Sequence, residues 1–270
     1  MRPKLAIVTA TTDYDRAWDC IKTWDAVLAD FFIVVVSGGG TRVCYKPAER
    51  VFHYNIPEVC GTVKPFLIGC EIAEELGADV TLCLHDDVEI LSRNWRQEVR
   101  EWWEWKGHPI FGFGGATRLA SDHVHDGRLE APDCSAQEIV ARLARADFVS
   151  NMRDAEAHGR RVAAEAIRVA CLDGFSIGGS ATHILDAWRL MDRIGIIHHA
   201  YDSAFGGWAK RYGVPVWMFP IPCHHRGGVT AVGDPAYQAF AATLGGDQEL
   251  WMQAHKAFYK EFKKELPIRV

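Results

Sequence analysis

The chain has 270 residues, of which 49% are hydrophobic and 24% charged, as is usual for a globular protein of one or two domains with a substantial core. A net charge of −5 argues against a generally basic nucleic-acid-binding protein. No apolar run reaches the roughly 18 residues of a membrane-spanning helix, the first residues lack the pattern of a signal peptide, and the eight cysteines form no Cys-x-x-Cys pair. We therefore expect a cytoplasmic protein with reduced thiols and no integral membrane segment.

The first 90 residues alternate between strand-like and helix-like patterns. Apolar, partly β-branched runs predict strands, and apolar residues at helical spacing predict the helices between them. The predicted elements are strands at residues 5–9, 31–36 and 51–54, a strand from Val80 that ends at two aspartates, and helices after Asp13–Asp15 and over residues 63–76. This alternation predicts an α/β fold, in which a mixed, mostly parallel sheet lies between two layers of helices.

The second half contains one segment of different character. Residues 117–162 are polar, and we interpret them as an insertion that is partly a mobile loop or lid, with a helical pattern at 136–146. The other predicted elements are helices at 94–105, 181–191 and 201–212, strands at 110–115, 162–171 and 214–219, and a helical tail from Pro235. We expect one domain over residues 1–234, including the insertion, with a C-terminal helical tail over 235–270 packed on it.

Two adjacent carboxylates follow the apolar run of the segment VTLCLHDDVEI, residues 80–90. Unpaired charges are costly inside a buried strand, so Asp86 and Asp87 indicate that the strand ends there and opens into a cleft. In open α/β sheets ligands bind at that end of the strands. Carboxylate oxygens suit Mg²⁺ or Mn²⁺, although a solvated turn would carry the same residues.

Two further polar sites interrupt apolar elements. His224 and His225 follow a predicted strand, and an imidazole together with a carboxylate is able to complete a divalent-metal site. Asp202 begins a predicted helix, where it is suited to act as a general base towards a hydroxyl or to cap the helix. A solvated turn is the alternative for the two histidines.

The order of these elements resembles that of the GT-A-fold glycosyltransferases, in particular the family-2-like group that uses nucleotide-sugar donors. The resemblance spans roughly residues 4–228. Its pieces are IVTATTDYDR at 7–16 with the helix that follows, GTVKPFLIG at 61–69, LHDD at 84–87 in place of the family's Asp-x-Asp motif, CLDGFSI at 171–177, and residues 201–216 with His224 and His225 after them.

The resemblance implies transfer of a hexosyl or pentosyl group from a nucleoside-diphosphate sugar to an acceptor hydroxyl, dependent on Mn²⁺ or Mg²⁺ and inverting at the anomeric carbon. Asp202 would be the base, and UDP is the favoured nucleotide. The implied metal ligands are Asp87, His85, His224 and His225. The implied donor-binding residues are Thr9, Ala10, Thr11, Asp13, Arg16, Ser37, Lys64 and Asp86. The candidate acceptor contacts are Asp173, Gly174, Trp208 and, in the insertion, Asp154, Glu156, His158, Arg160 and Arg161. The acceptor itself stays open between a saccharide, a lipid-linked sugar, a protein and a hydroxylated nucleic-acid base.

The sequence departs from the family pattern at two places. His85 stands where the family has the first acid of Asp-x-Asp, and Ser37-Gly38-Gly39 stands where many relatives place an acidic pair that holds the nucleotide. The glycines also allow a sugar-nucleotide nucleotidylyltransferase, whose glycine loop cradles phosphates. The segment His123-Val124-His125-Asp126 allows a metal-dependent hydrolase, and a non-catalytic carbohydrate- or nucleotide-binding module is a third alternative.

Overall fold

The computed structural model describes residues 2–24, 30–39, 43–46, 51–119, 145–153, 155, 160–226 and 234–270. Three predicted features lie outside these residues: the His123-x-His125 motif, most of the helix expected at 136–146, and the candidate acceptor residues Asp154, Glu156 and His158. Among the described helices, none is long and apolar enough to cross a membrane.

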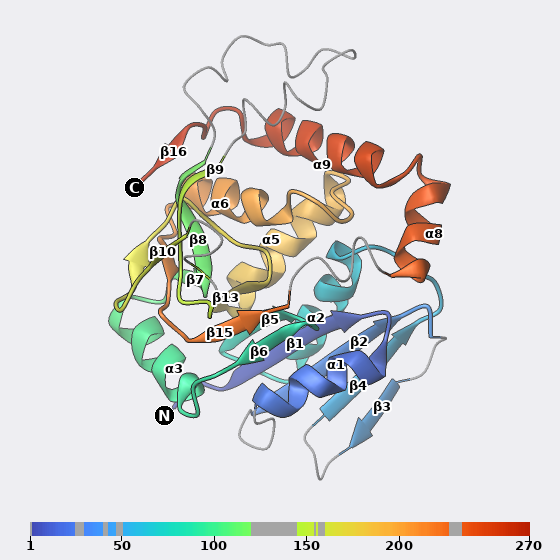
Figure 1. The fold of residues 1–270 in the computed structure, drawn as a ribbon, viewed down its shortest axis with the longest axis horizontal. Coiled ribbons are helices and arrows are strands. Elements are labelled where there is room, and N and C mark those ends of the chain that lie inside the picture. The colour runs from blue at the N-terminus through green and yellow to red at the C-terminus, as the bar shows by residue number, and fades with distance from the viewer. Residues whose placement is uncertain are drawn as a thin grey trace.

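The centre of the molecule is a mixed sheet of nine described strands, in the spatial order β11-β14-β7-β13-β5-β1-β2-β4-β3 (Figure 1). Six of these strands run in one direction, and only β3, β11 and β13 run against them. The predicted α/β fold with a mixed, mostly parallel sheet is therefore confirmed. The strands are β1 (Leu5–Thr11), β2 (Phe31–Ser37), β3 (Val43–Lys46), β4 (Val51–Ile56), β5 (Val80–His85), β7 (Ile110–Gly112), β11 (Ile167–Arg168), β13 (Ser176–Ser180) and β14 (Val216–Met218).

Helices cover both faces of this sheet, and the alternation of side chains along β1 shows why. Leu5 and Ile7 enter a cluster with α1 and α3, whereas Ala6 and Val8 enter a second cluster with α2 and α5. All four side chains are fully buried, so β1 is covered on both faces, as its continuous apolar sequence predicts. These helices are α1 (Tyr14–Ile21), extended by a short 3₁₀ turn (Lys22–Trp24), α2 (Val63–Glu75), α3 (Trp95–Trp105) and α5 (Ala181–Arg193).

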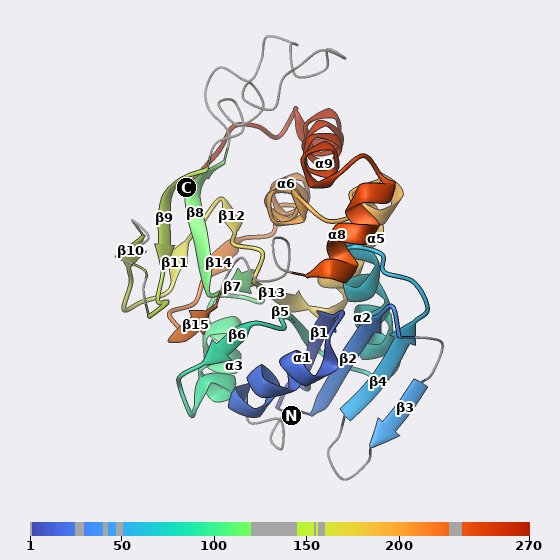
Figure 2. The same ribbon diagram turned by 45° about the vertical axis from the view of Figure 1, so that its right-hand side comes forward.

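A second, smaller sheet stands beside the first and was not predicted (Figure 2). The run at residues 110–115, expected as one strand, divides at Phe113 into β7 of the main sheet and β8 of the second. The backbone N–H of Phe113 donates to Ser176 Oγ at 2.7 Å instead of to a strand, which marks the change of sheet. The other strands of the second sheet are β8 (Gly114–Leu119), β9 (Arg145–Ser150), β10 (Arg161–Val162), β12 (Cys171–Leu172) and β16 (Ile268–Arg269).

The described part of the expected insertion belongs to this second sheet. β9 pairs antiparallel with β8, and β10 pairs with β9, so these residues extend a sheet rather than forming a separate loop or lid. The predicted strand at 162–171 is likewise divided between β10, β11 and β12. A sequence pattern cannot reveal this division, because each short strand is defined by partners far away in the chain.

The remaining elements close the upper part of the molecule in Figure 1. Helix α6 (Tyr201–Tyr212) coincides with the predicted range, and α8 (Pro235–Thr243) and α9 (Asp247–Phe262) form the expected helical tail. Phe258 and Phe262 of α9 are fully buried, and Phe262 lies against Gly207 of α6. A small two-stranded sheet pairs β6 (Val88–Ile90) with β15 (Cys223–His225).

Candidate functional site

The site forms where the order of the central sheet reverses. From the carboxyl end of β1 the chain continues through α1 to β2 on one side, whereas from the carboxyl end of β5 it continues through β6 and α3 to β7 on the other side. The two connections therefore lead away from each other, and a crevice forms between the carboxyl ends of β1 and β5. Ligands commonly bind in such a crevice of an open α/β sheet. A cavity of about 350 Å³ lies at this point. Ala10 and Thr11 line it from β1, and His85, Asp86 and Asp87 line it from the end of β5.

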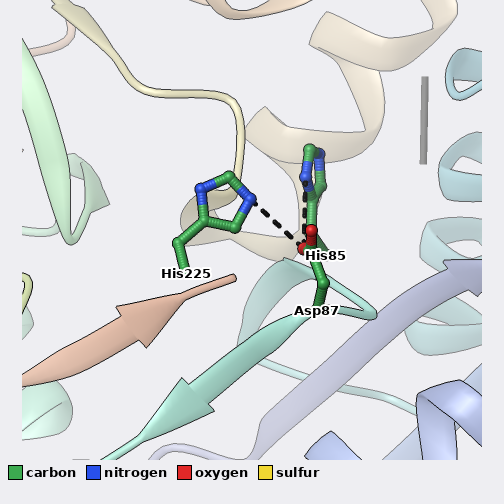
Figure 3. Close-up of side chains that lie close together, drawn as sticks. All are labelled: His85, Asp87 and His225. Carbon is green, nitrogen blue, oxygen red and sulfur yellow. Dashed lines mark ion pairs between the residues drawn. The ribbon is translucent and has the colours of Figure 1, made fainter. Parts of the chain in front are cut away.

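Three side chains converge in this cavity as a candidate metal centre (Figure 3). Their ligand atoms, one each from His85, Asp87 and His225, all lie within 4.8 Å of one another. Asp87 Oδ1 is 3.2 Å from His225 Nε2 and 4.0 Å from His85 Nδ1. This oxygen is buried, and His225 Nε2 is its near neighbour; among the described residues no donor reaches it in good hydrogen-bonding alignment, as expected of an atom that would coordinate a cation.

The second nitrogen of His85 is held in place from α6. His85 Nε2 lies 2.7 Å from the hydroxyl oxygen of Tyr201, and that hydroxyl donates to the carbonyl oxygen of Gly174 at 3.4 Å. Because the hydroxyl proton points at Gly174, we assign the imidazole proton to Nε2, which donates to the tyrosine oxygen. Nδ1 then carries its lone pair towards Asp87. A hydrogen-bonded outer nitrogen is the usual arrangement of a metal-binding histidine.

The electrostatics of the cluster favour the protonation states of metal ligands at His85 and Asp87. Burial lowers the pKa of His85 and outweighs the opposing effect of Asp87, so the imidazole favours its neutral form. Burial alone would raise the pKa of Asp87, but the neighbouring His225 and His85 bring it below its usual range. A neutral imidazole and an ionised carboxylate are the forms that bind a metal ion.

His224, the other candidate ligand, does not join the cluster. In the pairing of β6 with β15, His224 lies opposite Glu89 and His225 opposite Val88. Successive side chains on a strand point to opposite faces, so only one of the two histidines is able to reach Asp87. His224 Nδ1 instead lies 3.2 Å from a Glu89 oxygen, and Arg226 Nε donates to the same carboxylate at 3.0 Å.

The residues expected at the donor divide into two groups. Ala10, Thr11, Ser37 and Asp86 line the cavity, and Thr11 Oγ1 donates to Asp86 Oδ2 at 2.7 Å. Three others do not line it: Thr9 is fully buried within β1, Asp13 accepts the N–H of Asp15 at the start of α1, and Lys64 is exposed on α2. The side chain of Arg16 lies outside the described part of the chain.

Gly38 and Gly39, the described glycines after β2, do not offer their backbone N–H groups to a phosphate. The backbone N–H groups of Gly38 and Gly39 both donate to the carbonyl oxygen of Ile56, at 2.8 and 3.1 Å. Donors that are already used in this way are not available to phosphate oxygens. These two glycines therefore give no support to the nucleotidylyltransferase alternative, and Gly40, Thr41 and Arg42 lie outside the described residues.

On the acceptor side, Asp202, Asp173 and Gly174 line the same cavity. Asp202 lies in the first turn of α6 and Asp173 forms an ion pair with Arg160. Trp208 does not line the cavity, because it faces the core beside His183 and Tyr212 with only 4% of its surface exposed. Arg161 lies exposed at the start of β10.

The turn before α6 has an unusual backbone. Ala200 has φ of +61°, a left-handed conformation that costs free energy for a residue with a Cβ atom. This turn brings His198, His199 and Tyr201 to the cavity together with Asp202. Stored strain of this kind is common at functional sites, because it holds side chains in positions that a relaxed turn would not give.

Sequence analysis missed the contribution of the C-terminal tail. Tyr237 on α8 and Trp251 and His255 on α9 line the cavity, as do His198 and His199. Thr12, which follows β1, donates to Asp234, the residue that caps α8. One signal was available: Asp247, Trp251 and His255 recur at four-residue intervals, which places them on one face of a helix.

Comparisons with known proteins give little further information. No protein family model matches the sequence, and no curated protein is significantly similar to it. Among solved structures, one similar fold is that of the mannosyltransferase PcManGT from Pyrobaculum calidifontis, in complex with GDP-Man and Mn²⁺. The likeness covers 96% of this chain and 70% of that chain, with 11% sequence identity and a TM-score of 0.45. At this level the likeness decides neither substrate nor mechanism.

Proposed function

We propose that this protein is a metal-dependent glycosyltransferase that takes a sugar from a nucleoside-diphosphate sugar and transfers it to an acceptor hydroxyl. The observation that carries the proposal is the convergence of His85, Asp87 and His225 at the crevice between β1 and β5, in one cavity with Asp202. A crevice at this position suits a nucleotide, and a carboxylate across the cavity suits a general base.

The metal centre fits a divalent ion that accepts nitrogen ligands. Two imidazoles and one carboxylate favour Mn²⁺ or another transition ion over Mg²⁺, which prefers oxygen ligands and a shell of waters. A bound ion would supply Lewis-acid stabilisation of the departing nucleoside diphosphate. We assign ion binding to His85, Asp87 and His225, and donor contacts to Thr11, Ser37 and Asp86.

Asp202 is the residue we assign as base. Its carboxylate accepts the proton of the acceptor hydroxyl while the acceptor oxygen attacks the anomeric carbon and the bond from that carbon to the diphosphate oxygen breaks. A single displacement of this kind inverts the configuration at the anomeric carbon. Asp202 stands in the first turn of α6 and lines the cavity, where an acceptor hydroxyl can reach it.

The first experiment measures binding and slow hydrolysis of UDP-, GDP-, CDP- and dTDP-sugars, with and without Mn²⁺. We expect one donor to bind in a metal-dependent manner and to lose that dependence in Asp87→Asn, because the substitution removes the charged ligand while keeping its shape. Asp79→Asn is the matched control: Asp79 is an exposed acid just before the amino end of β5, at the opposite end of the strand.

Two outcomes would contradict the proposal. In the first, no donor binds under any condition, which would favour a binding module for another ligand. In the second, a donor binds equally well with and without metal and equally well to Asp87→Asn, which would separate the cluster from donor binding.

A further inference from the structure

One wall of the cavity comes from α9 and carries an aromatic pair. Trp251 and His255 lie one helical turn apart and their rings stack, with centroids 4.0 Å apart and planes inclined by 30°. Both side chains are partly buried and both line the cavity. Stacking covers one face of each ring, and the remaining ring surface of the pair adds aromatic area to a pocket that also holds carboxylates, imidazoles and the rings of Phe175 and Tyr237.

This surface belongs to the side of the cavity that holds Asp202. Helix α9 packs along α6, where Phe262 meets Gly207 and Arg211 pairs with Glu261 and Glu265. Asp202 stands in the first turn of that same α6. The donor-side residues, in contrast, come from the carboxyl ends of β1, β2 and β5.

The wall is fixed before any ligand arrives. One turn before Trp251, Asp247 Oδ1 lies 2.8 Å from His199 Nε2 and accepts the hydroxyl proton of Tyr237 at 2.5 Å. The ring of Tyr237 lies 4.4 Å from that of His198, which in turn contacts Thr62 at the start of α2. These contacts join α8, α9 and the turn before α6, so little ordering entropy remains to be lost when a ligand binds.

We propose that Trp251 and His255 form the acceptor subsite and bind the apolar face of a pyranose ring, so that the acceptor is a saccharide. This inference rests on the proposed function and narrows its acceptor. The C–H groups on one face of a pyranose pack against an aromatic plane, while the hydroxyl groups at its edge remain free to hydrogen-bond. One of those hydroxyls then faces Asp202, which accepts its proton.

The test uses methyl glycosides of mannose, glucose, galactose and N-acetylglucosamine as probes, with saturation-transfer NMR on the full chain. We expect the wild type to transfer saturation to the ring protons of at least one methyl glycoside. The signal is lost in Trp251→Ala, weakened in His255→Ala and retained in Trp251→Phe. Gln253→Ala is the matched control, because Gln253 is exposed on the same helix and bonds Glu249 rather than the cavity.

The outcomes separate this inference from the proposed function. If no methyl glycoside binds to the wild type, or if binding is unchanged in Trp251→Ala, the acceptor subsite is wrong whatever the donor does. If Trp251→Ala instead weakens binding of a nucleotide sugar, the aromatic pair belongs to the donor and the inference is overturned. A glycoside signal that depends on Trp251, with no nucleotide sugar bound, supports saccharide binding at the aromatic pair but removes its role as an acceptor subsite, because the transferase proposal then fails. Urea unfolding of Trp251→Ala and His255→Ala, compared with wild type and Gln253→Ala, excludes loss of folding as the cause if both variants are folded under the conditions of the NMR measurement.

Discussion

The residues around the metal centre show which features of the site a sequence motif is able to predict. Two acids after an apolar strand indicate a cleft because burial of unpaired charge is costly, and Asp86 and Asp87 indeed line the cavity with only 3% of their surface exposed. The choice between His224 and His225 could not be made from sequence. It depends on the register of β15 against β6, and a shift by one residue would exchange the two side chains.

At the same scale, Asp202→Asn tests the assigned base. The amide keeps the shape of the side chain but is a very weak proton acceptor. We expect the rate of sugar transfer to fall by about 10²–10⁴-fold, with donor binding unchanged. Steady-state transfer assays and donor titrations measure the two quantities. Asp186→Asn, an exposed position on α5, is the control and should transfer sugar like the wild type. An Asp202→Asn variant with full activity would remove Asp202 from the mechanism.

The elements themselves were predicted best where local pattern decides their structure. Helix α6 occupies the predicted range, and the first strands differ from prediction only at their ends. The exceptions are short strands defined by long-range pairing. β7 and β8 form one apolar run in the sequence, and only their pairing with different strands, with the hydrogen bond from Phe113 to Ser176 between them, shows where the chain leaves one sheet for the other.

Helix α6 also gives a prediction about packing. A Cβ atom at Gly206 would lie 2.6 Å from the backbone oxygen of Ala170 and 3.1 Å from Cys171 Cβ, so the helix depends on glycine for its close approach to β12. Alanine at this position would gain intrinsic helix propensity, yet we expect Gly206→Ala to lower the free energy of unfolding by about 1–3 kcal/mol. Urea unfolding measures it. Lys210→Ala, exposed on the same helix, should change stability by less than about 0.5 kcal/mol. A Gly206→Ala variant as stable as the wild type would show that α6 is free to shift.

At the scale of the whole molecule, sequence and structure differ most in the role of the tail. A helical segment packed on a domain was expected over residues 235–270, and only the four-residue spacing of Asp247, Trp251 and His255 indicated that one of its faces has a role of its own. That contribution depends on how α9 lies against α6, a contact between elements that periodicity does not specify. The sheet and the acids at its edge could be predicted, whereas the wall of the cavity that α9 contributes could not.

His198 lies in the turn before α6, between α2 and α8, and its burial predicts how the stability of the molecule changes at acidic pH. Burial and the neighbouring His199 lower the pKa of His198 to about 3, whereas a histidine in an unfolded chain titrates near 6.5. Protons therefore bind preferentially to the unfolded chain as the pH falls below about 6.5, and the free energy of unfolding decreases. We expect His198→Asn, which cannot titrate, to lose stability less steeply than the wild type between pH 7 and pH 5. Urea unfolding at a series of pH values measures both slopes, and parallel slopes would refute the assignment.

The position of Trp251 and His255 late in the chain has a consequence for synthesis. The ribosome makes β1, β5 and the start of α6 before it makes α9, and a polypeptide begins to fold from its N-terminal end as it emerges. A nascent chain therefore already contains the carboxylates of the cavity at a stage when Trp251 and His255 have not yet been made. If Trp251 and His255 bind the acceptor, an unfinished chain has a donor site in which only water is available to receive the sugar. Transfer to a saccharide then becomes possible only after translation has passed His255.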